Sequence, residues 1–166
     1  MALNAYLKLK GQNQGQIKGS VTQKGREGMI LVFAVDHSIV GPRDSASGQA
    51  TGKRTHNPFR ITKEVDKASV PLYSSLVTNE NISEWELKFW RPKTQGSGSG
   101  VEAQYFTVKL TNARVASVHL VKPNIKDPNL HNLPDYEEVE FTYQKIEWTW
   151  TDGGITAMDD WESPIV

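Results

Sequence analysis

The sequence predicts a mainly β protein with one α-helix and one long extended loop. Three segments alternate apolar and polar residues with a period of two, the pattern of a strand with one face on a core. Residues 68–77 carry apolar side chains at helical spacing, and the polar stretch 41–57 is too long for an ordinary turn. A length of 166 residues fits one domain, so we expect residues 1–166 to share a single core.

The predicted strands follow one another along the chain. Residues 5–9, 85–89 and 106–110 place apolar side chains at alternate positions, and 115–121 is a further strand candidate. The run Met29–Val35 is apolar throughout, which is typical of a strand buried on both faces. Its second face would lie under a helix or under a neighbouring subunit, and the pattern favours neither.

The one predicted helix lies within residues 68–77. Asp66 is a candidate N-cap, and Leu72 and Leu76 lie one helical turn apart on the same face. Pro71 is compatible only with a first turn, where its missing N–H has no partner to lose. Asn79 is a plausible end signal because asparagine tolerates the left-handed conformation.

The last predicted strand changes parity. Val139, Phe141 and Tyr143 occupy odd positions, whereas the apolar residues from Ile146 to Trp150 occupy even ones. Side chains alternate strictly in a straight strand, so one extra residue near Gln144-Lys145 is needed. We therefore predict a β-bulge there, which would bend the strand.

The remaining segments are connections and a tail. We predict loops over 11–16, 22–28, 41–57, 92–100 and 122–136, and a C-terminal tail over about 151–166. The Gly-Ser run 96–100 lacks the Lys-Ser/Thr ending of a phosphate loop and indicates a hairpin tip. Because long irregular loops are uncommon unless they are functional, 41–57 is the best candidate for a functional surface.

Composition excludes several classes of protein. Nineteen basic and nineteen acidic residues give zero net charge, which argues against a dedicated nucleic-acid binder. The chain has no cysteine, so disulfides and thiolate sites are excluded. The N-terminus lacks a signal-peptide pattern, and Met29–Val35 is far shorter than the ~20 residues of a membrane helix. We expect synthesis as a soluble cytosolic protein and no membrane insertion.

No residue pattern in the sequence indicates catalysis or a cofactor. His37 and His56 lack metal-ligand spacing, and no nucleophile elbow is present. The adjacent acidic pairs Glu137-Glu138 and Asp159-Asp160 face opposite ways on a strand and indicate solvated charge. Of the five tryptophans, Trp85 and Trp148 are in core-facing registers, Trp90 is predicted to be exposed, and Trp150 and Trp161 lie near the end of the chain.

Several segments together resemble one protein family. The segment 62–66, Thr-Lys-Glu-Val-Asp, and the segment 143–148, Tyr-Gln-Lys-Ile-Glu-Trp, are the most specific of them. The others are Arg26-Glu27-Gly28, Asp36-His37, Gly48–Gly52, Arg54–Phe59, Ser69, Leu72-Tyr73, Tyr105–Leu110, Ile125–Pro128 and Val139–Trp150. Over residues 3–153 the chain resembles Hcp, the tube-forming protein of the bacterial type VI secretion system.

The resemblance implies a fold and an assembly. The expected fold is a two-sheet closed β-barrel with one helix. The expected function is structural, without catalysis or cofactor: hexameric rings stack into a tube inside a Gram-negative cell. A contractile sheath then pushes the tube out of the cell with a spike protein at its tip, and effector proteins can travel in the lumen.

The charge distribution suggests how rings would stack. Residues 1–63 carry ten cations against three anions, so the rest of the chain is correspondingly acidic. A head-to-tail contact needs two different and complementary surfaces. We predict that the 41–57 loop projects from one face of the ring and contacts the next, with Arg43, Asp44, Lys53, Arg54 and His56 as stacking candidates.

Two other functions are compatible with the residues. One is a monomeric β-barrel or sandwich that binds a small ligand or glycan through its aromatic side chains. The other is a hydrolase that uses His37 or His56. The oligomeric state in solution separates both from a ring.

Overall fold

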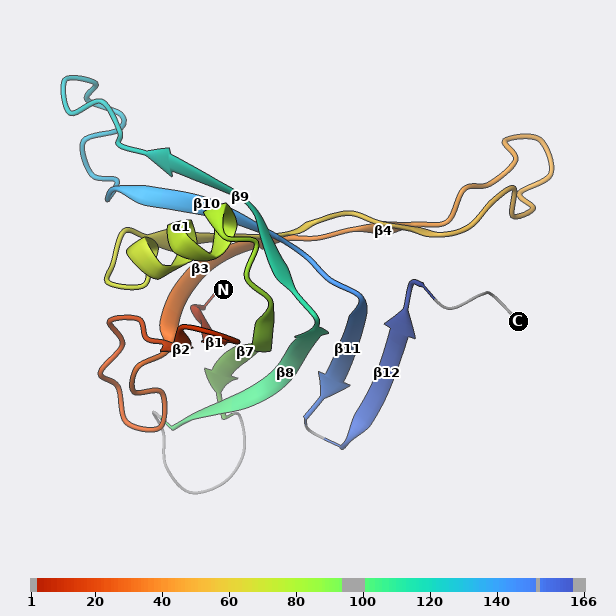
Figure 1. Cartoon of the computed structure of the whole chain (residues 1–166), viewed down its shortest axis with the longest axis horizontal. Helices are drawn as coiled ribbons and strands as arrows, with labels where there is room; N and C mark the ends of the chain where they lie inside the picture. The colour runs from red at the N-terminus through yellow and green to blue at the C-terminus, as the bar shows by residue number, and fades with distance from the viewer. Residues whose placement is uncertain (1–2, 94–100, 152, 163–166) are drawn as a thin grey trace.

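The computed structural model describes residues 3–93, 101–151 and 153–162. Within these ranges the chain forms strands and one helix, α1 (Ser69–Val77) (Figure 1). The Gly-Ser run 96–100, predicted to be a hairpin tip, lies outside the described residues. The strands are β1 (Ala5–Gly11), β2 (Gly15–Ile17), β3 (Ile30–Asp36), β4 (Ile39–Val40), β5 (Thr55–His56), β6 (Phe59–Glu64), β7 (Ile82–Pro92), β8 (Glu102–Thr111), β9 (Arg114–Val121), β10 (Tyr136–Thr142), β11 (Lys145–Trp150) and β12 (Ile155–Asp160).

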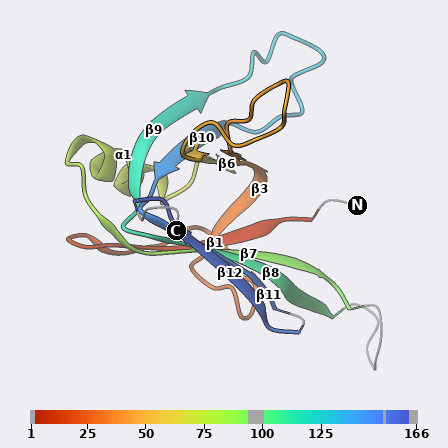
Figure 2. The ribbon, with the colours of Figure 1, turned by 90° about the vertical axis from the view of Figure 1, so that its right-hand side faces the viewer.

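Ten strands form one open sheet that is folded over on itself. Its strand order is β12-β11-β8-β7-β1-β3-β6-β10-β9, with β2 paired to β1, while β4 and β5 form a separate two-stranded sheet. Figure 2 shows β6, β9 and β10 on one side and β1, β7, β8, β11 and β12 on the other. The ring of Trp85 on β7 packs against the rings of Phe59 on β6 and Phe141 on β10, with ring centroids 4.9 and 5.6 Å apart. The core therefore joins the two sides.

The expected closed barrel is wrong for the described chain. The end strands β12 and β9 are not hydrogen-bonded to each other. Continuous chain joins the two sides instead, because β8 runs on into β9 and β10 runs on into β11. At this corner Asn112 has a positive φ of 51°, and its amide donates a hydrogen bond to the Gln144 side chain at 2.7 Å. The two chain segments β8–β9 and β10–β11 pair with each other and bend together, and they connect the two sides where a closed barrel would have hydrogen bonds between its end strands.

The predicted change of parity is confirmed, but not as a bulge within one strand. Val139 and Phe141 are fully buried before the corner, and Ile146 is fully buried after it. The chain ends β10 at Thr142 and starts β11 at Lys145, with Gln144 in a bend. The extra residue is absorbed where the strand changes partners, from β6 and β9 to β8 and β12.

The apolar strand β3 owes its lack of alternation to a register shift. Val32 pairs with Lys63 and Ala34 pairs with Thr62, so Phe33 is an additional residue. The predicted burial on both faces does not occur within the chain, since Phe33 is 43% exposed and Val35 is 37% exposed. The helix does not cover them, because it packs against β9.

The helix matches its predicted limits, but its first turn differs. Ala68 is at the N-cap position and makes no side-chain cap, while the Asp66 carboxylate accepts a hydrogen bond from the Ala68 N–H at 2.9 Å. Pro71 is the third helical residue, within the first turn as expected. Asn79 ends the helix with a positive φ of 53°.

A buried ion cluster fixes the helix start to the sheet. Lys63 on β6 and Glu137 on β10 are register partners, and neither side chain is exposed. The Lys63 ammonium donates to Glu137 at 2.5 Å and to the Ser69 hydroxyl at 3.1 Å, and it lies 2.9 Å from the Asp66 carboxylate. The interpretation of Glu137 as solvated charge is therefore wrong.

Candidate functional site

Most of the 41–57 loop belongs to an extended two-stranded arm, which we define as residues 39–56. Strands β4 and β5 pair at its base through Ile39–His56 and Val40–Thr55, and Arg43 bridges to Ala50 further out. The backbone N–H groups of Asp44 and Thr51 donate across the arm to Gln49 and Pro42 at 2.8 and 3.0 Å. Figure 1 shows the arm leaving the folded sheet and extending far beyond it.

Three of the five stacking candidates lie on the outer arm. Arg43, Asp44 and Lys53 are exposed. The Asp44 carboxylate accepts the Ala46 N–H at 2.7 Å, and hydrogen bonds from the backbone of Ala46 and Ser47 lower the pKa of Asp44. The carboxylate is therefore ionised, and it shares the outer arm with the exposed cations Arg43 and Lys53.

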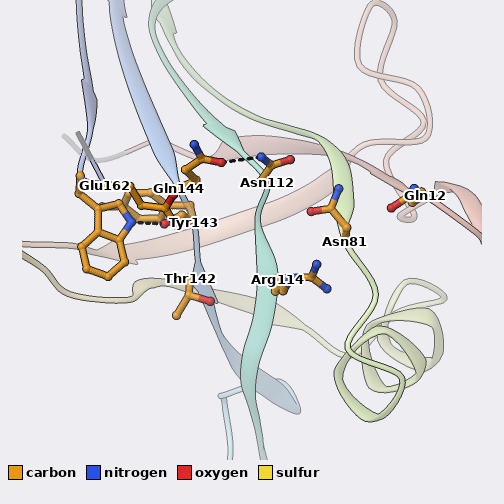
Figure 3. Close-up of a pocket in the computed structure, with 9 residues that line it drawn as sticks. Gln12, Asn81, Asn112, Arg114, Thr142, Tyr143, Gln144 and Glu162 are labelled. Atoms are coloured by element: carbon orange, nitrogen blue, oxygen red, sulfur yellow. Dashed lines mark hydrogen bonds between the residues drawn. The ribbon is translucent and has the colours of Figure 1, made fainter.

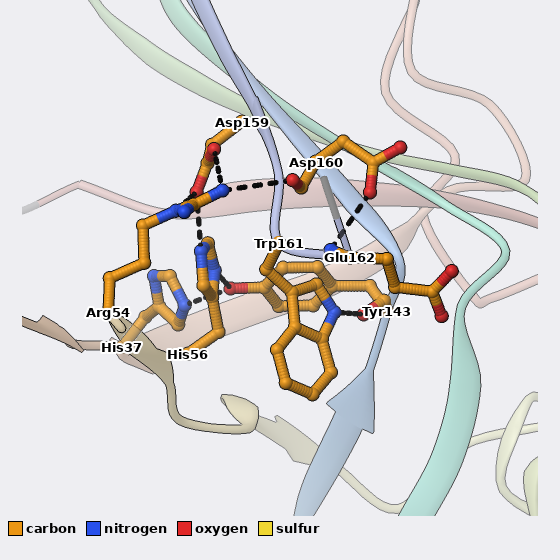
Figure 4. A network of polar contacts seen from close by, with 8 residues as sticks. All are labelled: His37, Arg54, His56, Tyr143, Asp159, Asp160, Trp161 and Glu162. Atoms are coloured by element: carbon orange, nitrogen blue, oxygen red, sulfur yellow. Dashed lines mark hydrogen bonds and ion pairs between the residues drawn. The ribbon is translucent and has the colours of Figure 1, made fainter. Parts of the chain in front are cut away.

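The fourth candidate, Arg54, contacts the C-terminal strand instead of solvent. Its guanidinium donates to both oxygens of Asp159 on β12, at 2.5 and 2.6 Å, and to the Asp160 carbonyl at 2.9 Å (Figure 4). A two-pronged arginine–carboxylate pair of this kind is both strong and directional. Hydrogen bonding from Arg54 lowers the pKa of Asp159 more than burial raises it.

The fifth candidate, His56, is nearly buried, with 2% of its side chain exposed. Its Nε2 lies 2.7 Å from the Asp159 carboxylate, and its Nδ1 lies 2.7 Å from the Tyr143 hydroxyl. The same hydroxyl lies 2.8 Å from Nε2 of His37. The base of the arm, the corner segment and β12 thus meet at one polar cluster, which we call the arm-base cluster: His37, Arg54, His56, Tyr143 and Asp159.

The donors in this cluster form one directional chain. With both imidazoles uncharged, His56 donates from Nε2 to Asp159, so its Nδ1 accepts the Tyr143 hydroxyl proton. His37 then donates to the Tyr143 oxygen. Burial lowers the pKa of His37, and repulsion from His56 adds to this whenever that ring is protonated, against the opposing effect of Asp36. The net shift favours the uncharged form of His37.

The arm-base cluster does not have the chemistry of a hydrolase. Its hydroxyl belongs to Tyr143, which is 5% exposed, and burial strongly raises the pKa of that group. A nucleophile needs a lowered pKa or an accessible oxygen next to its base. Among the described residues no group of three or more potential ligands could hold a metal ion.

A polar pocket lies at the corner next to this cluster (Figure 3). Trp161 lies beside it and donates its indole N–H to the Tyr143 carbonyl at 2.5 Å. The pocket is lined by Gln12, Asn81, Asn112, Arg114, Thr142, Tyr143, Gln144, Trp161 and Glu162. Trp90, which we predict to be exposed, is instead half-buried. The Arg26 guanidinium carbon lies over its ring, 3.9 Å from the ring centroid.

Apolar side chains also line a surface groove along β3. Phe33 and Val35 lie there with Leu3, which is 38% exposed, and with Phe89 and Tyr105 from β7 and β8. Strands β8, β7, β1 and β3 are consecutive in the sheet, which brings these side chains together in one groove. Within one copy of the described chain, no helix packs over this groove.

The sequence reasoning missed Asp159 and Tyr143 as partners of the arm. The prediction of a tail over about 151–166 is wrong for residues 155–160, which form β12 and bring Asp159 back to residues 54–56. Tyr143 was assigned to the core by parity, which its burial confirms. One signal in the sequence could have indicated a shared partner. Arg54 and His56 are two residues apart in an extended segment, so their side chains share a face.

Comparison with known proteins gives a consistent result. The family model described as "Type VI secretion system effector, Hcp" matches residues 6–150. The "Major exported protein" of Pseudomonas aeruginosa is 35% identical over 174 residues, covering 99% of each chain. The solved Hcp1 protein of E. coli is 37% identical with a TM-score of 0.82, covering 96% of this chain and 99% of that one. A further Hcp crystal structure is 30% identical with a TM-score of 0.87, covering 97% and 99%.

Proposed function

Because the chain belongs to the Hcp family of type VI secretion proteins, we propose that it forms hexameric rings that stack into the inner tube of that system. The family is one of secreted structural proteins and not of enzymes. The single observation that carries self-assembly is the uncovered apolar groove along β3. Phe33 and Val35 in this groove are 43% and 37% exposed, and a second copy seated on it would remove these large apolar side chains from water.

Ring stacking is assigned to the arm. An exposed arm with Arg43 and Lys53 beside an ionised Asp44 offers charges of both signs to the next ring. Arg54 and His56 contribute indirectly, because their polar atoms are held by Asp159 and Tyr143. Residues 1–166 act as one domain in this proposal, with the arm and the C-terminal strand as its extensions.

The proposed partners follow from the family. The tube assembles in the cytoplasm inside a contractile sheath, carries a spike protein at its tip and holds effector proteins in its lumen. It is then exported, in agreement with a relative named as a major exported protein. In the described part of the chain, the helix is too short to cross a membrane.

The test combines mass and imaging. Size-exclusion chromatography with light scattering should give one species of several-fold monomer mass, and electron microscopy should show rings. The variant R43E/K53E should keep the ring and shorten or abolish tubes, while K18E/K24E, with the same charge change elsewhere, should behave as wild type. Raised salt should partly mimic the arm variant. A strictly monomeric protein would refute the proposal and favour the ligand-binding alternative.

A further inference from the structure

The C-terminal strand β12 is a weakly covered edge strand. It pairs with β11 on one side, and its residues 155–158 are exposed. Asp159 is the exception, because its carboxylate points to the base of the arm and accepts from both Arg54 and His56 (Figure 4). One carboxylate on an edge strand therefore contacts two side chains of another element far away in sequence.

The arm has few other attachments, of which one is apolar: Ile39 at its base packs against the core. At its base, the Asn57 N–H donates to the Ser38 carbonyl at 3.1 Å, and the Asn57 amide donates to the Ser38 hydroxyl at 2.6 Å. These bonds join the outgoing and returning chains to each other and not to the sheet. Within the described residues, the side-chain hydrogen bonds from residues 39–56 to other elements run to Tyr143, Asp159 and Asp160.

We propose that Asp159 is a positioning residue that fixes the direction of the arm relative to the folded sheet. A two-stranded ribbon is only marginally stable alone, so its direction depends on what holds its base. The paired Arg54 fork supplies direction and His56 supplies a second anchor on the same carboxylate. The consequence of this inference rests on the proposed function: by holding the arm, strand β12 determines whether the arms of one ring reach the next ring.

Trypsin provides a direct readout of the anchor. Cleavage after Arg54 requires that its side chain leave Asp159, whereas cleavage after Arg43 on the exposed outer arm does not. The ratio of cuts at Arg54 to cuts at Arg43 should rise about tenfold in D159N, because charged hydrogen bonds that hold the Arg54 side chain are lost. The variant R54K, which trypsin still cuts at this position, should show a smaller rise, because lysine keeps the charge without the fork.

The control is D160N, which removes the same charge from the same strand. The Asp160 side chain accepts from Gln144 and from the Glu162 N–H and does not bind Arg54, so its cleavage ratio should stay within about twofold of wild type. Light scattering should show wild-type ring mass for all three variants. Tubes seen by electron microscopy should be shorter or absent in D159N and present in D160N.

Two results would overturn the inference. One is an unchanged cleavage ratio in both D159N and R54K, which would show that Asp159 does not hold the arm. The other is a raised ratio with tubes of wild-type length, which would show that arm direction does not govern stacking. If the wild type forms no rings, the proposed function fails, and the cleavage ratio still decides whether Asp159 anchors the arm.

Discussion

Replacing Lys63 with methionine should be the most destabilising single change at a charged position of the sheet. The substitution removes a cation whose side chain is 0% exposed and leaves Glu137, also 0% exposed, without its partner. One oxygen of Glu137 already has no hydrogen-bond partner, and the other would keep only the neutral Ser69 hydroxyl, which donates to it at 2.6 Å. Asp66, 12% exposed, would lose the same cation.

The expected magnitude follows from the burial. Removing one partner of a buried ion pair costs about 3–5 kcal/mol. At about 2–4 °C per kcal/mol for a chain of this size, the melting temperature should fall by roughly 6–20 °C. Thermal unfolding followed by circular dichroism measures this shift. All variants are compared at one fixed protein concentration, since the melting temperature of a protein that self-assembles depends on concentration.

Two further variants make the reasoning testable. The double variant K63M/E137L removes the orphaned carboxylate together with the cation and should recover at least half of the loss. K122M breaks the exposed pair with Asp135, whose side chains are 70% and 49% exposed, and should cost less than about 1 kcal/mol. If K63M melts within about 2 °C of wild type, the argument from burial is refuted.

Three other predictions concern pH, the corner and the core. Folding lowers the pKa of His37, so as the pH falls below 6.5 the unfolded chain binds a proton at His37 before the folded chain does. The midpoint of urea unfolding should therefore decrease on acidification below that pH, and it should decrease less steeply in H37Q. N112A should cost about 1 kcal/mol, measured by urea unfolding, because alanine at a φ of 51° is strained; N112G at the same position should cost less. W85A should cost about 3–5 kcal/mol by the same measurement, since Trp85 is 1% exposed and joins both sides of the core; a loss below 1 kcal/mol would contradict that role.

The sequence predicted best where one face of a strand packs on the core. Alternation over 5–9, 85–89 and 106–110 corresponds to β1, β7 and β8, and the helix was placed within one residue of its observed limits. The period of two is a local property, so no knowledge of strand partners is needed. Strand order is not local, which is why the open, folded-over sheet could not be distinguished from a closed barrel.

Buried charge was predictable in part. Lys63 shares odd parity with Phe59 and Ile61, and Glu137 shares it with Val139 and Phe141, so the alternation itself places both on the core face. The general expectation that lysine and glutamate are solvated prevailed over this pattern. Their pairing across β6 and β10 could not be derived, because it depends on the register of strands about 70 residues apart.

The net charge of the arm segment does not show which of its charges are paired, whereas the structure does. The 41–57 segment has net charge +2, with Arg43, Lys53 and Arg54 opposed by Asp44. In the structure the Arg54 charge is neutralised by Asp159, so Arg43 and Lys53 remain against Asp44 on the outer arm. Each exposed contact of this kind is weak, so the stacking that we propose would depend on repetition of the contact around the ring. In the proposed tube, repeated contacts form together only when all arms point the same way, so a fixed arm base would matter more than the charge of any one arm.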